Sequence, residues 1–209
     1  MAGRIKNKPA APPGGSKKDL IERKALTFFS EKGYDATSMR EIAEAAGVTK
    51  PVIYYYFKNK EQLCHHLISS GLEEFRQSIQ RVCLEPSDDV LEQVVRMVQV
   101  HFDFCKSHLE FMRFIYAINF GPDRKKITYN FYDYSMSIFD MQVSLMRRMS
   151  QARLLKNGKE EAAVYYLRGI ISTFAMMYLD GRHPLNSNLA KNIVVDLVGG
   201  LGASGSRIR

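Results

Sequence analysis

ATSMREIAEAAGVTKPVIYYYFKNK, residues 36–60, predicts two short capped helices separated by a glycine turn. Ser38 and Glu41 have the spacing of a capping box, in which each side chain satisfies the other residue's backbone N–H, so the first helix should begin at Ser38. Gly47 should end that helix, because glycine enters the left-handed conformation without a Cβ penalty. The residues expected to face inward are Ile42, Ala45 and Ala46.

The second helix has its own start signals. Thr49 is a favourable N-cap residue, and Pro51 lies in the first turn, where its missing N–H breaks no intrahelical bond. This helix should run to about Phe57, and Asn59 with Gln62 marks the start of a further helix. Two capped helices joined by so short a turn are typical of a helix-turn-helix motif, whose second helix enters the major groove of DNA.

Residues 18–63 resemble the DNA-binding domain of the TetR family of one-component transcriptional regulators. Many residue types that the family pattern fixes occur here at the same spacing, which chance explains poorly. They are Gly33, Tyr34, Thr37, Ser38, Ile42, Ala43, Ala46, Gly47, Val48, Thr49, Ile53, Tyr54, Tyr56, Phe57, Lys60 and Leu63. Pro51 departs from the pattern, because glycine is more usual there. Beyond residue 63 the resemblance extends only to chain length and helix content.

Helices should also flank this motif on both sides. Four apolar residues at helical spacing predict a helix that ends at Gly33, namely Ile21, Ala25, Phe28 and Phe29. A long helix should run from Lys60 to just before Pro86 and join two domains. No segment of the remaining chain alternates apolar and polar residues as a half-buried strand does, so the whole chain is expected to be helical.

Several features subdivide the C-terminal part. An apolar helical stripe is formed by Leu91, Val94, Val95, Val98, Phe102 and Cys105. A capping box at Ser107 and Glu110 predicts another helix start, and Gly121-Pro122 predicts a break. A long helical segment should then run from about residue 123 to 155.

Two apolar helices should complete the chain. Residues 163–179 carry a single charge, Arg168, and are apolar nearly all round, which favours burial on more than one side. This segment is short for a membrane span. A last amphipathic helix is indicated by Leu189, Ile193, Leu197 and Leu201.

Charge is shared unevenly along the 209 residues. Residues 1–60 contain 12 Lys/Arg and 6 Asp/Glu, whereas the rest of the chain contains 18 and 16. The positive field therefore coincides with the helix-turn-helix, as phosphate binding requires, although a solvated basic face would have the same composition.

We expect an all-α fold with an N-terminal three-helix helix-turn-helix domain and a C-terminal helical domain. Residues 1–17 should be a disordered basic arm, 18–63 the DNA-binding domain, 64–203 the effector-binding and dimerisation domain, and 204–209 a flexible tail. The arm is either a solubilising tail or a segment that lies along phosphates or in the minor groove.

Four side chains should be exposed near the N-terminal end of the recognition helix, the end that enters the major groove: Lys50, Pro51, Tyr54 and Tyr55. Lys50 can donate to guanine O6 or N7, and Pro51 can pack on a thymine methyl group. Tyr56 and Phe57 are expected in the core. Arg40, on the outer face of the preceding helix, either reaches a phosphate or is solvated.

The resemblance implies further contacts with the DNA backbone. Tyr54 and Lys60 correspond to phosphate contacts. Hydroxyl or helix-start N–H contacts to the same backbone are implied for Thr37, Ser38 and Thr49.

The C-terminal part is rich in aromatic residues, with fifteen of the 23 between Phe102 and Tyr178. A helical core needs such residues, so for any single side chain the core explanation is the stronger one. The resemblance implies an effector cavity among residues 88–178 and dimerisation through the last two helices. The predicted lining residues are Phe102, Phe114, Ile118, Met136, Tyr166 and Phe174.

Other residues give little sign of catalysis or cofactor binding. Three cysteines without paired spacing, Cys64, Cys83 and Cys105, indicate buried thiols in a reducing compartment. The N-terminus has no apolar signal-peptide core and no uncharged run is long enough to span a bilayer, so we expect a cytoplasmic protein. His101, Cys105 and His108 have nominal metal-ligand spacing, but the helix should end between them. We predict no metal, no cofactor and no catalytic residue.

The sequence therefore favours a homodimeric, ligand-responsive regulator. It would be a repressor released from a palindromic, double-stranded DNA operator by a small, mostly apolar effector. One alternative is a ligand-independent architectural DNA-binding protein, which the aromatic-rich C-terminal part disfavours. A second alternative, a helical-bundle enzyme, is disfavoured by the lack of catalytic motifs.

Overall fold

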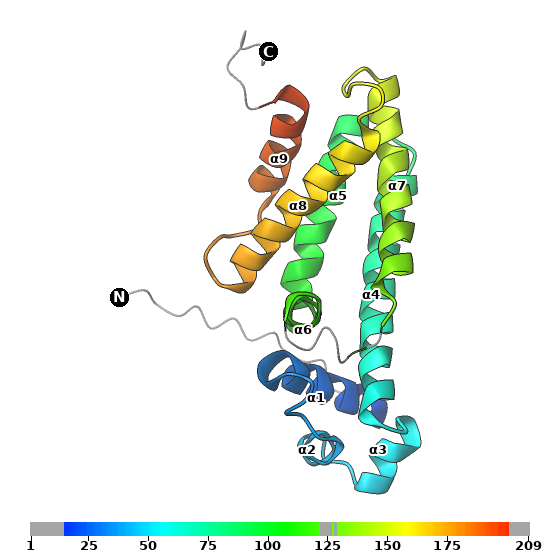
Figure 1. The fold of residues 1–209 in the computed structure, drawn as a ribbon, viewed down its shortest axis with the longest axis vertical. Helices are drawn as coiled ribbons and strands as arrows, with labels where there is room; N and C mark the ends of the chain where they lie inside the picture. Colours follow the sequence, from blue (N-terminus) through cyan, green and yellow to red (C-terminus); the bar gives the residue numbers. More distant parts are fainter. Residues whose placement is uncertain (1–14, 122–126, 128, 201–209) are drawn as a thin grey trace, which may run out of the picture. The chain divides into compact units, whose positions relative to one another are not determined.

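The computed structural model describes residues 15–121, 127 and 129–200. Within these ranges every regular element is a helix, in the order drawn in Figure 1. The chain divides into two compact units, Met1–Leu67 and Ile68–Arg209. The boundary falls inside one continuous helix, α4 (Lys60–Leu84). The prediction of an all-α chain is confirmed.

The first unit is built from α1 (Lys17–Lys32), α2 (Met39–Ala45), α3 (Lys50–Tyr56) and the start of α4. The first three helices pack against one another. All four contribute to the buried apolar interior, which includes Ile21, Ala25, Phe29, Ile42, Ile53 and Leu63. The predicted inward stripe of the first helix is therefore present, although Phe28 is only half buried.

α1 begins inside the segment that the sequence assigned to the arm. Ser16 Oγ accepts a hydrogen bond from the backbone N–H of Asp19 at 3.2 Å, and the Asp19 carboxylate accepts one from the N–H of Ser16 at 2.8 Å. This capping box starts the helix at Lys17. The rest of the predicted arm, residues 1–14, lies outside the described residues.

α2 begins where the sequence predicts. Ser38 Oγ accepts from the backbone N–H of Glu41 at 3.2 Å, and Glu41 accepts from the N–H of Ser38 at 2.9 Å. The prediction that Ala45 faces inward is wrong, because it is exposed. The buried face is formed by Met39, Ile42, Ala43 and Ala46. At 3.6 residues per turn, Ala45 lies about 110° from the centre of that face.

The turn after α2 is a Schellman motif. Gly47 has a φ of +64°, and its N–H donates to the carbonyl oxygen of Glu44 at 3.2 Å. The N–H of Val48 donates to the carbonyl oxygen of Ala43 at 3.0 Å. These bonds satisfy carbonyls that the end of a helix leaves free, and they require a residue that tolerates positive φ. The glycine therefore fixes where α3 starts relative to α2.

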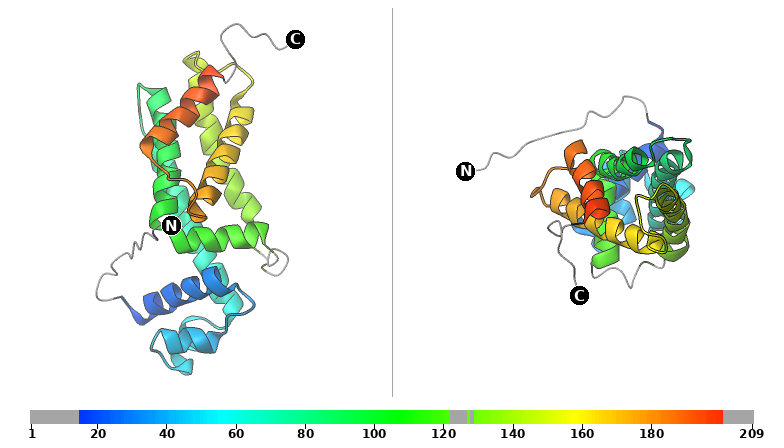
Figure 2. Two further views of the ribbon diagram at one scale, coloured as in Figure 1. Left: turned by 90° about the vertical axis from the view of Figure 1, so that its left-hand side faces the viewer. Right: turned by 90° about the horizontal axis from the view of Figure 1, so that it is seen from above.

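The second unit is a bundle of helices formed by the remainder of α4 and by α5 (Val90–Ser107), α6 (Leu109–Phe120), α7 (Phe131–Gln151), α8 (Glu160–Leu179) and α9 (Ser187–Gly199). Four of these helices, α6 to α9, pack against α5. α8 and α9 lie side by side at one side of the bundle in Figures 1 and 2. The predicted stripe of α5 supplies much of the interior through Val94, Val98, Phe102 and Cys105.

Two predicted helix starts in this unit are wrong. Ser107 is the last residue of α5, and its hydroxyl donates to the carbonyl oxygen of Asp103 at 2.8 Å instead of capping a new helix. Serine hydroxyls can satisfy backbone groups at either end of a helix, so the capping-box spacing was ambiguous. α7 begins only at Phe131, after the N-cap residue Asn130, and residues 122–126 lie outside the described residues.

α8 is longer and more exposed than the sequence predicts. It contains 20 residues, and several of its apolar side chains reach solvent: Tyr165, Tyr166, Ile170 and Met176. In the described part of the chain, α8 is the one helix long and apolar enough to cross a membrane. Of its most apolar 18-residue stretch, 28% is buried inside the chain. Its inner face packs against α5 and α7. α9 and α6 also pack against α8, and the four apolar side chains named above remain exposed among the residues that the structure describes.

The three cysteines are free and buried, as predicted. Burial raises the pKa of the Cys64 and Cys83 thiols to about 12 and that of Cys105 to about 11. Thiols with such pKa values are protonated at neutral pH and unreactive, so the cysteines pack as small apolar side chains.

Candidate nucleic-acid interface and cavity

α3 exposes the side chains that the sequence assigned to the DNA-reading face. Tyr54 is 41% exposed and Tyr55 83% exposed. Ile53 on the opposite side is completely buried and anchors the helix. The four exposed side chains are Lys50, Pro51, Tyr54 and Tyr55. Because none of them is needed to fill the core, they are free to contact a ligand outside the unit.

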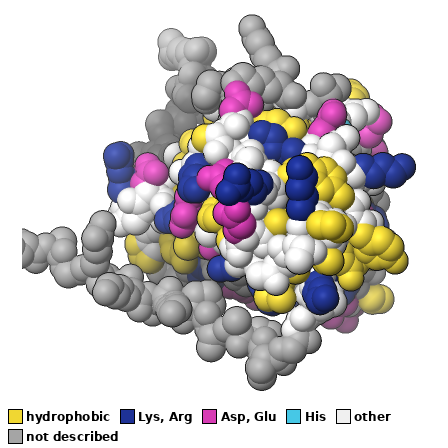
Figure 3. Space-filling view, turned by 90° about the horizontal axis from the view of Figure 1, so that it is seen from below, with side chains coloured by type: hydrophobic (Ala, Val, Ile, Leu, Met, Phe, Trp, Pro, Cys, Tyr) yellow, Lys and Arg dark blue, Asp and Glu magenta, His cyan; other side chains and the backbone are white. Residues whose placement is uncertain are grey.

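Lys50 and Tyr54 lie one helical turn apart on this face. Lys50 Nζ is 5.9 Å from the centroid of the Tyr54 ring, which suits a weak cation–π contact. Among the described residues no carboxylate pairs with Lys50. Figure 3 shows the molecule from below, with Lys and Arg side chains (dark blue) lying among hydrophobic side chains (yellow), a group that here includes tyrosine. A cation beside phenol rings can bind base edges and phosphates.

The predicted hydroxyl contacts differ in availability. Thr49 is exposed at the N-cap of α3, and its side chain makes no capping hydrogen bond, so the hydroxyl is available to a phosphate. Ser38 is also exposed, but its hydroxyl and its N–H both donate to Glu41 Oε2, at 2.8 and 2.9 Å. These hydrogen bonds from Ser38, followed by the contact with Lys32, lower the pKa of Glu41.

Arg40 lies in an exposed ion pair. Its Nε donates to Glu44 Oε1 at 2.8 Å, and both side chains are largely solvated. Exposed pairs of this kind are readily exchanged for another anion, because water screens the attraction between the two charges. Arg40 can therefore reach a phosphate only by giving up Glu44, so both interpretations from the sequence remain open.

Thr37 does not belong to the exposed set. Its side chain is 1% exposed, and its hydroxyl donates to the carbonyl oxygen of Gly33 at 2.9 Å. The enclosed and already bonded hydroxyl disfavours a contact of this group with DNA, and the implied contact of Thr37 stays a prediction. This hydrogen bond of Thr37 instead stabilises the loop between α1 and α2. Tyr56 is half buried and Phe57 is buried, as predicted for core residues.

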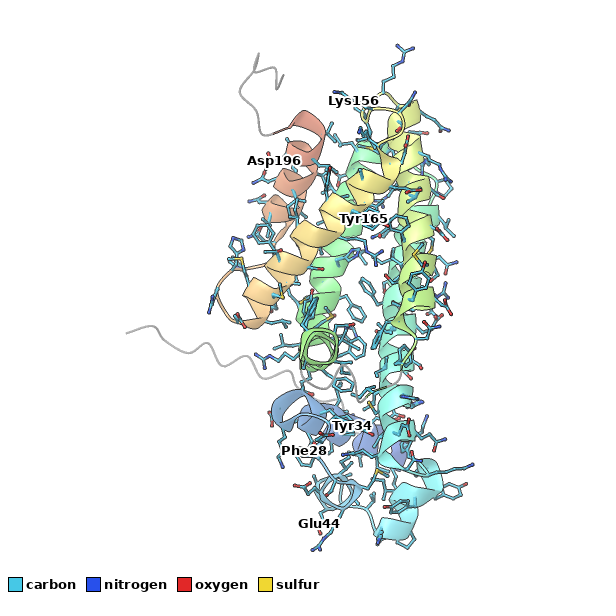
Figure 4. All side chains as sticks on the ribbon, in the orientation of Figure 1. Phe28, Tyr34, Glu44, Lys156, Tyr165 and Asp196 are labelled. Atoms are coloured by element: carbon cyan, nitrogen blue, oxygen red, sulfur yellow. The ribbon has the colours of Figure 1, made fainter. Side chains whose placement is uncertain are left out.

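Lys60 is also occupied inside the first unit. Its Nζ donates to the carbonyl oxygens of Tyr34 at 2.8 Å, Thr37 at 2.9 Å and Asp35 at 3.4 Å. The same Nζ lies 4.3 Å from the centroid of the Tyr34 ring, which is labelled in Figure 4. An ammonium group has three N–H donors, and three carbonyls occupy them. This geometry disfavours a phosphate contact by Lys60, which stays a prediction, and shows that Lys60 holds the loop between α1 and α2.

We expect Lys60→Met to lower the free energy of unfolding by about 1–3 kcal/mol, because it leaves loop carbonyls without their charged donor while keeping most of the apolar stem. Chemical denaturation followed by circular dichroism measures this loss. Lys58→Met is the matched control, since Lys58 is exposed beside the same helix start. Equal unfolding midpoints for Lys60→Met and the wild type, with weaker DNA binding, would restore the phosphate-contact role.

The second unit contains a cavity of about 150 Å³ between α4, α5, α6 and α8. Its walls include Phe75, His101, Met112, Tyr116, Arg168 and Ile171. Burial lowers the pKa of His101 to about 4, although the hydrogen bond between its Nδ1 and the carbonyl oxygen of Met97 opposes this shift. The His101 ring is therefore neutral at pH 7.

The six lining residues predicted from the sequence lie elsewhere. Phe102, Phe114 and Ile118 are at most 2% exposed, and Phe102 belongs to the main buried apolar cluster of the unit. Met136 is partly buried against the same interior. Tyr166 and Phe174 line a different feature, an apolar groove of about 370 Å³ between α8 and α9. None of the six belongs to the 150 Å³ cavity, whose walls are formed by other residues.

The nominal metal spacing in α5 does not assemble a site. His108 Nε2 pairs with Glu74 Oε1 at 3.0 Å, and its ring stacks on Phe104. His101 Nδ1 is bonded to the carbonyl oxygen of Met97 at 2.8 Å. In the part of the chain that the structure describes, no group of three or more His, Cys, Asp or Glu side chains could hold a metal ion.

Known proteins resemble the first unit in sequence. Residues 21–67 match the family described as bacterial regulatory proteins, tetR family. YttP of Bacillus subtilis, a probable HTH-type transcriptional regulator, is 34% identical over 102 residues, which cover 48% of this chain and 49% of YttP. IcaR of Staphylococcus epidermidis, a negative transcriptional regulator of the biofilm operon icaADBC, is 44% identical over 58 residues, 28% of this chain and 31% of IcaR. The chain spans about half the length of the first curated relatives that it matches.

Solved structures resemble nearly the whole chain in fold. The transcriptional regulator FadR from Bacillus subtilis, in complex with stearoyl-CoA, superposes with a TM-score of 0.70 at 20% sequence identity. The match covers 88% of this chain and 100% of FadR. At this identity the likeness concerns the arrangement of helices and not the identity of a bound molecule.

Proposed function

We infer that this chain, a member of the TetR family of bacterial regulatory proteins, regulates transcription by binding DNA and does not catalyse a reaction. The observation that carries this inference is the family match over residues 21–67, which contain α3 and its exposed reading face. Such a regulator works on the chromosome, so its place is the bacterial cytoplasm.

The regulator would bind a palindromic operator as a homodimer. One recognition helix contacts only a few base pairs, and a two-fold dimer that reads two half-sites supplies the missing specificity. The outer face of α8 and the groove between α8 and α9 support this proposal, because they present exposed apolar side chains in the part of the chain that the structure describes.

We further propose that the protein is a repressor released by a small, mostly apolar effector bound in the second unit. The cavity of about 150 Å³ gives such a molecule a place, and its walls are mainly apolar with a few polar groups, as in small-molecule sites. The names of two similar proteins support repression and ligand binding, a negative regulator and a regulator crystallised with stearoyl-CoA. The rival is an architectural DNA-binding protein that responds to no ligand.

Selection of DNA fragments by the purified full-length protein tests the proposal. We expect enrichment of inverted repeats whose half-sites lie about 10 base pairs apart, or a multiple of that spacing, so that both recognition helices meet the major groove. Enrichment of bent or A·T-rich DNA without a repeated half-site would instead favour the architectural protein.

Lys50→Ala should relax base preference as well as weaken binding. We expect a loss of about 1–3 kcal/mol on the selected operator and reduced discrimination at one or two base pairs per half-site. Fluorescence anisotropy on the operator and on single-base variants measures both effects. Lys24→Ala is the matched control, because Lys24 is an exposed lysine of α1 in the same unit. An equal loss on operator and random DNA would assign Lys50 to the phosphates.

A further inference from the structure

Arg168 is a half-buried cation on α8, in the wall of the cavity of the second unit. Its Nη2 donates to Ser135 Oγ at 2.7 Å, and its Nη1 lies 3.4 Å from the carbonyl oxygen of Ser135. The guanidinium carbon lies 5.9 Å from the centroid of the Phe139 ring. Among the described residues no carboxylate lies within ion-pair distance of Arg168.

This arrangement is unfavourable for the protein alone. Burial lowers the pKa of Arg168, which reports the cost of taking its charge out of water. A guanidinium has five N–H donors, and Ser135 accepts from two of its nitrogens. A purely structural link between α7 and α8 needs neither a full charge nor the donors left over. The location of Arg168 in the cavity wall gives those donors a possible use.

The other polar groups of the cavity leave the positive charge uncompensated. His101 Nδ1 lies 2.8 Å from a carbonyl oxygen, which can only accept, so Nδ1 carries the proton. Tyr116 donates its hydroxyl hydrogen to the carbonyl oxygen of Ser172 at 3.4 Å. No acidic side chain contributes to the wall. An anionic group entering the cavity would therefore meet one unpaired cation and no competing carboxylate.

Size limits the rest of the ligand. A dry cavity of about 150 Å³ in another protein accommodates benzene, so a single ring or a chain of roughly six to eight carbons suits the volume here. Phe75 and Ile171 supply apolar wall for such a group.

We propose that this cavity binds a small carboxylate, whose anionic group accepts hydrogen bonds from Arg168 and whose ring or short alkyl chain lies against Phe75 and Ile171. The proposal rests on the proposed function, because it specifies the effector of that regulator as an organic acid. Arg suits this role better than Lys, since the planar guanidinium can donate two parallel hydrogen bonds to one carboxylate.

Calorimetric titration of the full-length protein at pH 7 tests the charge requirement. The probes are benzoate, phenylacetate and hexanoate, each paired with its neutral amide. We expect at least one acid to bind the wild type about 10-fold or more tightly than its amide, as a charge-assisted bond predicts. Arg168→Met should abolish this preference, whereas Arg168→Lys should keep part of it. Comparing the affinities of the aromatic acids with that of hexanoate shows whether the cavity prefers a ring or an alkyl chain.

Arg147→Met is the matched control, because Arg147 is an exposed arginine of α7 in the same unit, and it should behave as the wild type. Equal affinities of acid and amide for the wild type would overturn the proposal, as would the absence of binding by every acid. If Arg168→Met fails to fold, the acid and amide affinities of the wild type and of Arg168→Lys still test the proposal.

A DNA-binding assay with the same compounds separates this proposal from the proposed function. Amides that release the operator as well as acids do would support an effector response and overturn the carboxylate site. Acids that bind through Arg168 but leave the operator bound would support the site and contradict the effector role.

Discussion

Ile170→Asp is expected to convert the protein into monomers and to weaken binding to a two-half-site operator by about 10²- to 10⁴-fold. Ile170 is 37% exposed and lines the groove between α8 and α9 together with Tyr166 and Phe174. If a second copy covers this surface, the new carboxylate is buried there without a partner, which opposes association. Monomers then bind each half-site independently and lose the effective concentration that the dimer provides.

Sedimentation velocity at micromolar concentration measures the association state, and anisotropy on the operator measures the second effect. Ser144→Asp is the matched control, since it adds the same charge at an exposed position of α7. Leu197, in α9, is a less suitable target because it packs partly against the unit's own interior. A variant that remains dimeric would place the interface elsewhere, and a monomeric wild type would contradict the dimer proposal itself.

The parts of the first unit that the sequence predicts correctly depend on neighbours in the chain. Ser38 and Glu41 cap α2 three residues apart, and Gly47 supplies the positive φ that its turn requires. These interactions close within one or two turns of helix, so spacing alone reveals them. The exposed face of α3 follows from the same local periodicity once Ile53 is placed in the core.

Lys60 and Thr37 show why the remaining contacts escape this kind of reasoning. Lys60 donates to carbonyls 23 to 26 residues earlier in the chain, and no short motif encodes such a contact. A lysine near a helix start has the same sequence signature whether it binds a phosphate or a loop. Only the tertiary geometry separates the two roles.

The cavity shows the same limit in the second unit. Its walls come from four helices, and which aromatic side chains fill the interior depends on how those helices rotate against one another. From the sequence alone, Phe102 and Phe114 are therefore as plausible as lining residues of the cavity as Phe75 is. One signal was present in the sequence, because Arg168 is the single charge within residues 163–179. A lone charge on an apolar helix marks either a buried contact or a ligand.

DNA and effector should weaken each other's binding by the same factor, in the range of about 5- to 150-fold. α4 is the element through which we expect this coupling to pass. Its Phe75 lines the cavity in the second unit, and its Lys60 holds the α1–α2 loop of the first unit. These two residues belong to the same helix. A ligand that displaces Phe75 would therefore act on the helix that anchors the reading domain.

Contacts within the second unit strengthen the link between α4 and the cavity. Gly71 packs so closely on Phe111 that a Cβ at position 71 would clash with its ring, and Phe111 is buried in α6. The next residue of α6, Met112, lines the cavity. Because close-packed helices shift together, a ligand that moves α6 should also move α4.

The measurement is a pair of calorimetric titrations with the tightest-binding acid from the panel above. One titrates the free protein and the other titrates the protein saturated with its operator. We expect the acid to bind the DNA-bound protein more weakly, because release requires that it favour the arrangement that does not bind DNA. A scrambled DNA of equal length controls for charge effects. Equal affinities in both titrations would mean that the acid does not regulate DNA binding, even where Arg168 holds it.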